Sequence, residues 1–247
     1  LLRTVRFEIV RELGRGGMGV VYEALDRDRH TRVALKTLDG LNPNALFRLK
    51  NEFRALHDLA HPNLVSLGEL HEEAGRWFFT MELITGVSFL EWVRPSAIST
   101  TRGHDLATAA DPPAARLDLN RLRDALAQLT RGVMALHAAA KVHRDLKPSN
   151  VLVSGEGRVV VLDLGLVARL HDGRQSERSV EGHAVGTIGY MAPEQAAGQA
   201  VGPSADWYSI GVMLFEALTG TRPYRGTPYQ VLVDKQRQAP PRPSSLA

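Results

Sequence analysis

Short apolar runs separated by turn residues mark the first third of the chain. Phe7-Glu8-Ile9-Val10 and Trp77-Phe78-Phe79-Thr80-Met81 are two of them, and each is rich in β-branched or aromatic residues. Gly, Asp or His-Pro signals border the runs. The pattern predicts strands over residues 7–10, 20–24, 33–36, 64–67 and 77–81. We therefore expect a small β-rich lobe at the start of the chain.

Three longer segments repeat their apolar residues at the spacing of an α-helix. Between Pro43 and Ala60, steps of three and four residues build one apolar face, made of Leu46, Leu49, Phe53, Leu56 and Leu59. A second helix is expected over residues 119–136. A third is expected over 204–219, where nearly every side is apolar, as in a helix buried inside a larger lobe. The β-rich and helical lobes would join near residues 82–86.

The segment 95–118 differs from its neighbours. It is rich in Ala, Thr, Ser and Pro, and its apolar residues show no periodicity. A structureless stretch of this length inside a domain is typically a surface loop. We expect a loop insertion at this point of the second lobe.

Composition excludes several classes of protein. The 247 residues are 44% hydrophobic, which is enough for a core of ordinary size and excludes intrinsic disorder. The net charge is +3, but the 30 basic and 27 acidic residues are interleaved, so no nucleic-acid binding is indicated. Cysteine is absent, which excludes a disulfide framework and a thiolate metal site. No run approaches the roughly eighteen apolar residues of a membrane span, and no signal peptide opens the chain.

These features favour a cytoplasmic location. The first residue is Leu1 and not Met, so we expect the chain to be a piece of a longer protein.

Candidate chemistry is concentrated around one polar run in the second lobe. His143-Arg144-Asp145-Leu146-Lys147-Pro148-Ser149-Asn150 is followed by Asp163, thirteen residues after Asn150. A short apolar hairpin over 151–153 and 159–162 separates them, so all the polar groups can converge at one end of its strands. Asn150 and Asp163 offer hard oxygen ligands for Mg²⁺, Asp145 can orient a hydroxyl nucleophile, and Lys147 can neutralise a group in transfer. The cluster predicts chemistry on a metal-bound polyphosphate.

This cluster resembles the catalytic loop and the metal-binding motif of protein kinases. A lysine two residues after the aspartate, here Lys147 after Asp145, resembles the serine/threonine branch of that family and not the tyrosine branch. Leu164 departs from the Phe of most members but fills the same apolar role. Later motifs come in the order of the family: residues 186–194 resemble the end of an activation segment, and Asp206-Trp207-Tyr208-Ser209-Ile210-Gly211 and Gly220-Thr221-Arg222-Pro223-Tyr224 complete the resemblance. The motifs over residues 14–22 and 190–195 look most similar to those of the bacterial, eukaryotic-like serine/threonine kinases.

The first lobe contains a glycine-rich motif and a lysine. Gly14-Arg15-Gly16-Gly17-Met18-Gly19 fits G-x-G-x-x-G, which alone is a weak signal because it also opens dinucleotide folds. Here β-branched residues follow at once, so the loop lies between two strands and its amides can cover phosphates. Lys36 ends an otherwise apolar strand and needs a partner, which Glu52 on the inward face of the 43–60 helix can supply.

The resemblance implies a role for each of these positions. Lys36 would hold the α- and β-phosphates and pair with Glu52, and the hinge around Glu82 would bind adenine through its backbone. The aspartate of the 204–219 helix would brace the backbone of the catalytic loop. The catalytic set is Asp145, Lys147, Asn150, Asp163, Lys36 and Glu52. The nucleotide-binding set is Leu13, Gly14, Gly16, Gly19, Val21, Ala34, Lys36, Met81, Glu82, Ile84 and Leu152, and the metal ligands are Asn150 and Asp163.

The resemblance also implies a fold. We expect an α+β bilobal chain, with a small antiparallel β-sheet lobe and one helix over residues 7–84, and a mostly helical lobe over 85–247. Kinase domains continue beyond the equivalent of Pro240, so the last helices of the second lobe are expected to be missing, which would expose apolar surface on the 204–219 helix.

The expected activity is transfer of the γ-phosphoryl group of ATP, with Mg²⁺ or Mn²⁺, to serine or threonine of protein substrates. Ser176 and Ser179 lie in a polar stretch suited to phosphorylation, with Arg144 as the partner of the added phosphate and another copy of the chain as a trans-autophosphorylation partner. Glu181, six residues before Thr187, stands where relatives often carry a phosphorylated threonine.

Two alternatives come from other classes. A pseudokinase or scaffold module would bind nucleotide without turnover, and loss of Lys36, Asp145, Asn150 or Asp163 would favour it, but all four are present. A small-molecule phosphotransferase of related fold is disfavoured by residues 186–194, which resemble a segment that serves protein substrates.

Overall fold

The computed structural model describes residues 4–16, 19–38, 40, 42–95, 116–164 and 187–245. Its first part is a five-stranded antiparallel sheet in the order β1-β2-β3-β5-β4. The strands are β1 (Phe7–Gly16), β2 (Gly19–Asp26), β3 (Thr31–Leu38), β4 (Leu67–Glu73) and β5 (Arg76–Glu82). β3 and β5 are neighbours in this sheet, with Lys36 opposite Phe79 and Ala34 opposite Met81.

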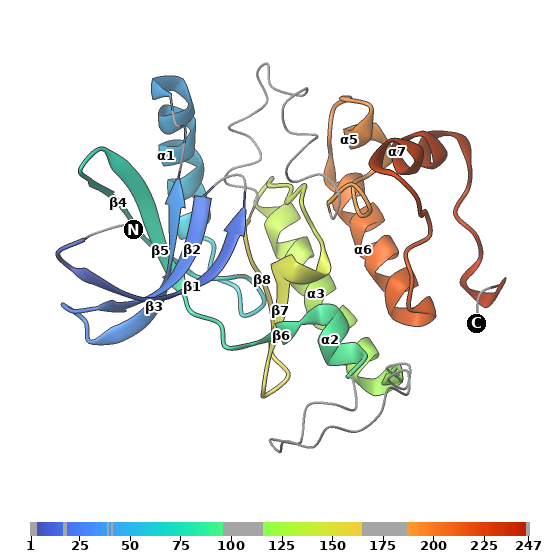
Figure 1. Ribbon diagram of the computed structural model, residues 1–247, viewed down its shortest axis with the longest axis horizontal. Helices are drawn as coiled ribbons and strands as arrows, with labels where there is room; N and C mark the ends of the chain where they lie inside the picture. Colours follow the sequence, from blue (N-terminus) through green and yellow to red (C-terminus); the bar gives the residue numbers. More distant parts are fainter. Residues whose placement is uncertain are drawn as a thin grey trace, which may run out of the picture.

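One helix, α1 (Pro43–His57), stands beside this sheet (Figure 1). Asn42 caps its start by accepting a hydrogen bond from the backbone N–H of Ala45, and Pro43 at the first position fits a helix N-terminus. Leu49, Phe53 and Leu56 are buried, as their spacing predicts. Phe53 meets Phe79 of β5 edge to face, with 5.7 Å between the ring centroids. α1 is therefore attached to the sheet by its apolar face.

The second part of the chain is mostly helical. It contains a three-stranded sheet, β6 (Gly86–Ser88), β7 (Val151–Ser154) and β8 (Val159–Val161), and a 3-10 turn, η1 (Pro148–Asn150). Its helices are α2 (Phe89–Val93), α3 (Leu119–Ala138), α5 (Pro193–Ala196), α6 (Pro203–Thr219) and α7 (Pro228–Arg237), and a second 3-10 turn is η3 (Pro243–Ser245). Of these, α2 and α3 contact the strands. In Figure 1, α6 lies beside α3, and α5 and α7 lie beyond α6.

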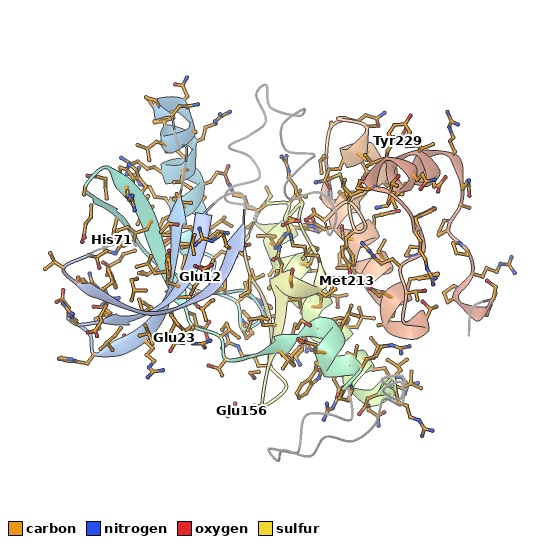
Figure 2. All side chains as sticks on the ribbon, viewed as in Figure 1. Glu12, Glu23, His71, Glu156, Met213 and Tyr229 are labelled. Carbon is orange, nitrogen blue, oxygen red and sulfur yellow. The ribbon has the colours of Figure 1, made fainter. Side chains whose placement is uncertain are left out.

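A single hydrophobic core continues through both parts. It includes Leu49 and Phe79 of the first part and Leu129 of α3 and Met213 of α6 in the second. Met213, labelled in Figure 2, is fully buried. The segment before β4 joins the parts, because the backbone N–H of Val65 donates to the carbonyl of Val161, and the N–H of Val161 donates to the carbonyl of Asn63. The expected α+β, bilobal architecture is confirmed.

Two expectations from the sequence need correction. Of the strand expected over residues 64–67, only Leu67 belongs to the first sheet, since β4 begins at Leu67 and Leu64 makes an isolated bridge to Val161. Leu64 and Val65 are apolar because they are buried between the two parts. α6 is not buried on all sides, and its buried residues are not all apolar: Trp207 is 39% exposed, and Asp206 is fully buried. The expected insertion over 95–118 lies outside the described residues except at its ends.

No helix in the described ranges is both long enough and apolar enough to cross a membrane.

Candidate active site

One buried carboxylate accepts hydrogen bonds from the backbone at the start of the catalytic loop. Asp206 of α6 accepts the N–H of His143 at 2.9 Å and the N–H of Arg144 at 2.8 Å. His137 of α3 adds a third contact, with 2.7 Å between its Nε2 and Oδ2 of Asp206. Arg144 adopts a φ of 68°, which is uncommon for a residue with a side chain and has to be held by its surroundings. The sequence-based role of Asp206 as a brace agrees with these contacts.

Asp145 is held from one side. Its Oδ2 accepts hydrogen bonds from Lys147 Nζ at 2.9 Å and from Asn150 Nδ2 at 3.0 Å. Asn150 Nδ2 also donates to the backbone carbonyl of Asp145, which fixes the side chain relative to its own backbone. The other oxygen, Oδ1, is buried and has no partner within the described ranges. One carboxylate oxygen is therefore anchored and the other is left to accept a proton or a hydrogen bond from elsewhere.

Lys147 connects Asp145 to residues 187–192, which we call the acceptor segment. Lys147 Nζ also donates to Oγ1 of Thr187 at 3.0 Å. The ammonium thus lies between the catalytic carboxylate and the start of the acceptor segment. A cation at this position can hold negative charge on a group transferred past Asp145.

The backbone of Asn150 is bonded to the residue that precedes Asp163. The N–H of Leu162 donates to the carbonyl of Asn150 at 2.8 Å, which places Asp163 beside the end of η1. Asp163 has a φ of 52°, in the left-handed region that aspartate tolerates better than most residues. Asn150 uses its amide nitrogen on Asp145, so its amide oxygen remains for a ligand. An amide oxygen and a carboxylate are hard donors that fit Mg²⁺ or Mn²⁺, which take further oxygens from phosphates and water.

These two residues do not form a metal cage by themselves. No group of three or more His, Cys, Asp or Glu side chains that could hold a metal ion occurs in the described part of the chain.

The expected ion pair between Lys36 and Glu52 is not formed, and this corrects the sequence interpretation. Lys36 Nζ bonds instead to Oδ1 of Asp163 at 2.6 Å, and Glu52 Oε2 bonds to Nζ of Lys141 at 2.6 Å. Lys36 is buried, as its apolar strand predicts, and a buried ammonium takes the nearest available carboxylate. The sequence shows that both charges need partners but not which of several carboxylates and ammonium groups will meet.

The glycine-rich hairpin between β1 and β2 has the form that the sequence predicts. Gly14 pairs with Val21, and Gly16 pairs with Gly19. Gly19 has a φ of 133°, and a Cβ atom there would collide with the backbone carbonyl of Thr37 on β3. Only glycine fits at that position, which lets the hairpin approach β3. Gly17 and Met18 lie outside the described residues.

The proposed adenine site borders the junction of the two parts. Ala34 and Met81 are paired neighbours on β3 and β5 and are buried, while Val21 and Ile84 are partly buried against the same core. Leu13 of β1 is 39% exposed. Leu152 of β7 is partly exposed between its buried neighbours Val151 and Val153, so it faces away from the core. The apolar residues for an adenine site are thus the following: Leu13, Val21, Ala34, Met81, Ile84 and Leu152.

Glu82 has a side-chain contact that the sequence did not reveal. Arg158, before β8, forms a bidentate pair with it, with Nη1–Oε1 and Nη2–Oε2 distances of 2.5 and 3.1 Å. The hydrogen bond to Glu82 raises the pKa of Arg158. Arg158 Nε also donates to the carbonyl of Pro62 at 2.8 Å. The hinge residue is therefore tied to the second part through its side chain, while its backbone N–H donates to the carbonyl of Ser66 at 2.9 Å.

Further residues of the expected activation segment lie outside the described residues. They include Gly165, Ser176, Ser179, Glu181 and Gly186. The acceptor segment at its end is described. Tyr190 donates its hydroxyl to Glu216 of α6 at 2.5 Å, and burial followed by this contact raises the pKa of Tyr190.

Sequence reasoning missed three charged residues at this site: Lys141, Arg158 and Lys235. Each contacts a residue or segment named above, but each is a single charge outside any motif. Lys141 gives the only local signal, since it comes two residues before His143.

The two-part fold, with an anchored aspartate beside two oxygen donors for a metal and a buried lysine opposite them, is that of a phosphotransferase acting on a nucleotide. The chain belongs to the protein kinase domain family, whose model matches residues 7–243.

Curated relatives are serine/threonine-protein kinases. PknA of Mycobacterium tuberculosis is 32% identical over 246 residues, which cover 96% of this chain and 52% of PknA. Pkn1 of Myxococcus xanthus is 36% identical over 254 residues, or 99% of this chain and 33% of Pkn1. PknE of Mycobacterium bovis is 34% identical over 243 residues, or 97% of this chain and 39% of PknE. The chain spans between a third and about half of the length of these relatives.

Proposed function

We propose that this chain is the catalytic domain of a serine/threonine protein kinase, which transfers the γ-phosphoryl group of ATP to protein hydroxyls. The observation that carries the proposal is the anchoring of Asp145. One of its oxygens is bonded by Lys147 and Asn150, and the other is buried and unpaired within the described ranges. An oxygen in that state is suited to orient a serine or threonine hydroxyl and to accept its proton.

The remaining side chains have defined tasks in this proposal. Lys147, between Asp145 and Thr187, neutralises charge on the transferred group. Asn150 and Asp163 would hold Mg²⁺ or Mn²⁺ through their side-chain oxygens, and that ion, when bound, supplies charge neutralisation on the phosphates. Lys36 binds the α- and β-phosphates from the side of the first lobe.

For this function, Lys36 has to leave Asp163 and Glu52 has to leave Lys141, so that Lys36 and Glu52 can pair with each other. Lys36 is bonded to Asp163, and Glu52 is bonded to Lys141. When nucleotide and metal occupy Lys36 and Asp163, Lys36 becomes available to Glu52. We propose that Glu52 acts as the clamp on Lys36 only after it leaves Lys141. The arrangement seen here is a resting one.

The nucleotide would lie between the lobes, which we divide at residues 7–84 and 85–247. Gly14, Gly16 and Gly19 would cover the phosphates, and the backbone of Glu82 and Ile84 would bind the adenine. The bidentate pair between Arg158 and Glu82 supports this, because it removes the Glu82 side chain from the adenine position and fixes the hinge.

Regulation and location extend the proposal. Phosphorylation of Ser176 or Ser179 by a second copy of the chain would bring a phosphate to Arg144, and the carbonyl of Arg144 is already fixed by Gln195 at 2.8 Å. We propose cytoplasmic protein substrates. The names of the curated relatives support a protein substrate over a small molecule.

The test is an Asp145→Asn variant. It should lower turnover on a protein acceptor by about 10³-fold or more while changing the Kd for ATP less than twofold, because Asp145 contacts the acceptor and not the nucleotide. Titration of ATP analogue binding and steady-state transfer to dephosphorylated casein measure the two effects. Turnover equal to that of the wild type would remove Asp145 from the mechanism, and absence of transfer by the wild type with ATP still bound would favour the pseudokinase alternative.

A further inference from the structure

Lys235 of α7 buries its charge against backbone carbonyls. The residue is 5% exposed, and its Nζ donates to the carbonyl oxygens of Ile188 at 2.6 Å, Gly189 at 2.8 Å and Met191 at 2.7 Å. An ammonium has three hydrogens, so these bonds use all of them. In the described part of the chain, no carboxylate pairs with this cation.

This placement is unfavourable for a residue that only fills space. Burial and then the charge of Arg222 lower the pKa of Lys235 to about 7. The ammonium also lies over the ring of Tyr208, 5.4 Å from its centroid. An apolar side chain would avoid the loss of hydration. We therefore attribute the burial of Lys235 to its hydrogen bonds with the three carbonyls.

The three carbonyls belong to the acceptor segment. The carbonyl of Tyr190, between them, accepts a hydrogen bond from Ser209 Oγ of α6 at 2.9 Å. Four successive carbonyls, those of residues 188–191, are thus held by side chains from α6 and α7. Thr187, which begins the segment, contacts Lys147 at 3.0 Å, and Lys147 contacts Asp145. Lys235 is therefore connected to the carboxylate of Asp145 through the backbone of residues 187–191 and the side chains of Thr187 and Lys147.

α7 is built to hold Lys235 at a fixed depth. Thr227 and Gln230 form a capping box at its start. At its end, the hydroxyl of Tyr224 donates to the carbonyl of Gln238 at 2.7 Å. The side chain of Arg222 lies over Gly189, so a Cβ atom there would meet its guanidinium. A shift of the helix against the segment would break the three hydrogen bonds of Lys235.

We propose that Lys235 is a positioning residue for the protein acceptor. By holding the carbonyls of residues 188, 189 and 191, it fixes the acceptor segment at the distance from Asp145 at which a bound serine or threonine can be phosphorylated. The inference rests on the proposed function of the site and deepens it, because it names the residue that shapes the acceptor side without touching nucleotide.

The test compares Lys235→Met with the matched control Lys50→Met. Lys50 lies on α1, with its Nζ 4.5 Å from the ring centroid of Trp77 and away from the catalytic loop. In the 247-residue chain, Lys235→Met should reduce kcat/KM for dephosphorylated casein at least tenfold, mainly through KM, and change the Kd for ATP less than twofold. Lys50→Met should change neither. A side chain with only a structural role would lower the apparent kcat with the folded fraction and leave KM for casein unchanged, so a rise in KM with an unchanged Kd for ATP distinguishes the two roles.

Hydrogen exchange gives a readout that does not need activity. The amides of Tyr190 and Met191 bond to the carbonyl of Thr187 within the segment. Their exchange should become at least tenfold faster in Lys235→Met, while the amides of β3 and β5 stay unchanged. If the wild-type chain transfers no phosphate, the proposed function fails but this measurement still decides the inference: faster exchange supports the tether, and unchanged exchange overturns it.

An active wild type with an unchanged KM for casein in Lys235→Met overturns the inference and leaves the proposed function intact. If the methionine variant does not fold, Lys235→Gln replaces it, since its amide retains two of the three donors. Its KM for casein should then lie above that of the wild type, and equality would overturn the inference.

Discussion

Removing Lys141 should activate the protein, because Lys141 holds Glu52 in the resting arrangement. The Lys141–Glu52 contact is 2.6 Å long, and the two side chains are 17% and 19% exposed. Exposed pairs contribute about 0–1 kcal/mol, and breaking a buried pair costs about 3–5 kcal/mol. For a pair with this exposure we expect about 1–2 kcal/mol. That free energy corresponds to a roughly 5–30-fold change in the ratio of resting to active arrangements.

The perturbation is Lys141→Met, which keeps the length of the side chain and removes its charge. We expect kcat/KM for ATP to rise by about 5–30-fold in transfer to dephosphorylated casein, because the ammonium of Lys141 no longer competes with Lys36 for Glu52. The assay is a titration of ATP at saturating acceptor, with Lys50→Met as the control lysine variant on α1.

A double-mutant cycle tests the cause of this activation. In a Glu52→Gln background, Lys141→Met should have no further effect, because Lys141 is expected to act only through Glu52. The reasoning is refuted if Lys141→Met lowers kcat/KM, or if it raises kcat/KM equally in both backgrounds. The first outcome would make the Lys141–Glu52 pair part of the active arrangement, and the second would mean that Lys141 acts through another group.

Two further predictions concern the first lobe. Gly19→Ala should lower the free energy of unfolding by about 1–3 kcal/mol and weaken ATP binding, because Gly19 has a φ of 133° and its Cβ would collide with Thr37. The control is Gly14→Ala, which has open space around it and should leave the free energy of unfolding in urea nearly unchanged. The hydrogen bonds from Arg6 lower the pKa of Asp26 to about 2, so the contribution of this carboxylate is present above about pH 4 and is lost as the pH falls through 2. Asp26→Asn should therefore be less stable than the wild type by about 1 kcal/mol at pH 7, after allowance for solvent screening, and the difference should disappear near pH 2; a difference that is constant with pH would contradict the assignment.

Regular elements were predictable where one physical demand decides the pattern. The apolar spacing from Leu46 to Leu56 predicts α1 because a helix on a sheet must bury one stripe. The same reasoning fails for residues 64–67. Leu64 and Val65 are apolar because they lie between the two lobes, where Leu64 bridges to Val161, and burial alone does not distinguish a strand from a buried connection. The short elements β6, α2 and α7 have too few residues for a periodicity to show.

The catalytic cluster was predictable because its groups are close together in the sequence. Asp145, Lys147 and Asn150 lie on one loop, and a single hairpin returns the chain to Asp163, so local geometry is enough to bring them together. The ion pairs of Lys36 and Glu52 were not predictable in the same way. Lys36 pairs with Asp163 and Glu52 pairs with Lys141, so each pair joins residues far apart in the chain, and nothing in the sequence ranks these partners.

Contacts with backbone acceptors leave no trace in the sequence, and this explains why Lys235 was missed. A carbonyl is present at every residue, so the three that bind Lys235 cannot be read from the letters Ile188, Gly189 and Met191. The structure nevertheless gives α6 and α7 a common task. Asp206 of α6 fixes the backbone of the catalytic loop from one side, and Lys235 of α7 fixes the acceptor segment from the other. The backbone that carries Asp145 and the acceptor segment, which Lys147 connects to Asp145, are thus each held by one buried charge, so the position of Asp145 relative to the acceptor segment depends on α6 and α7.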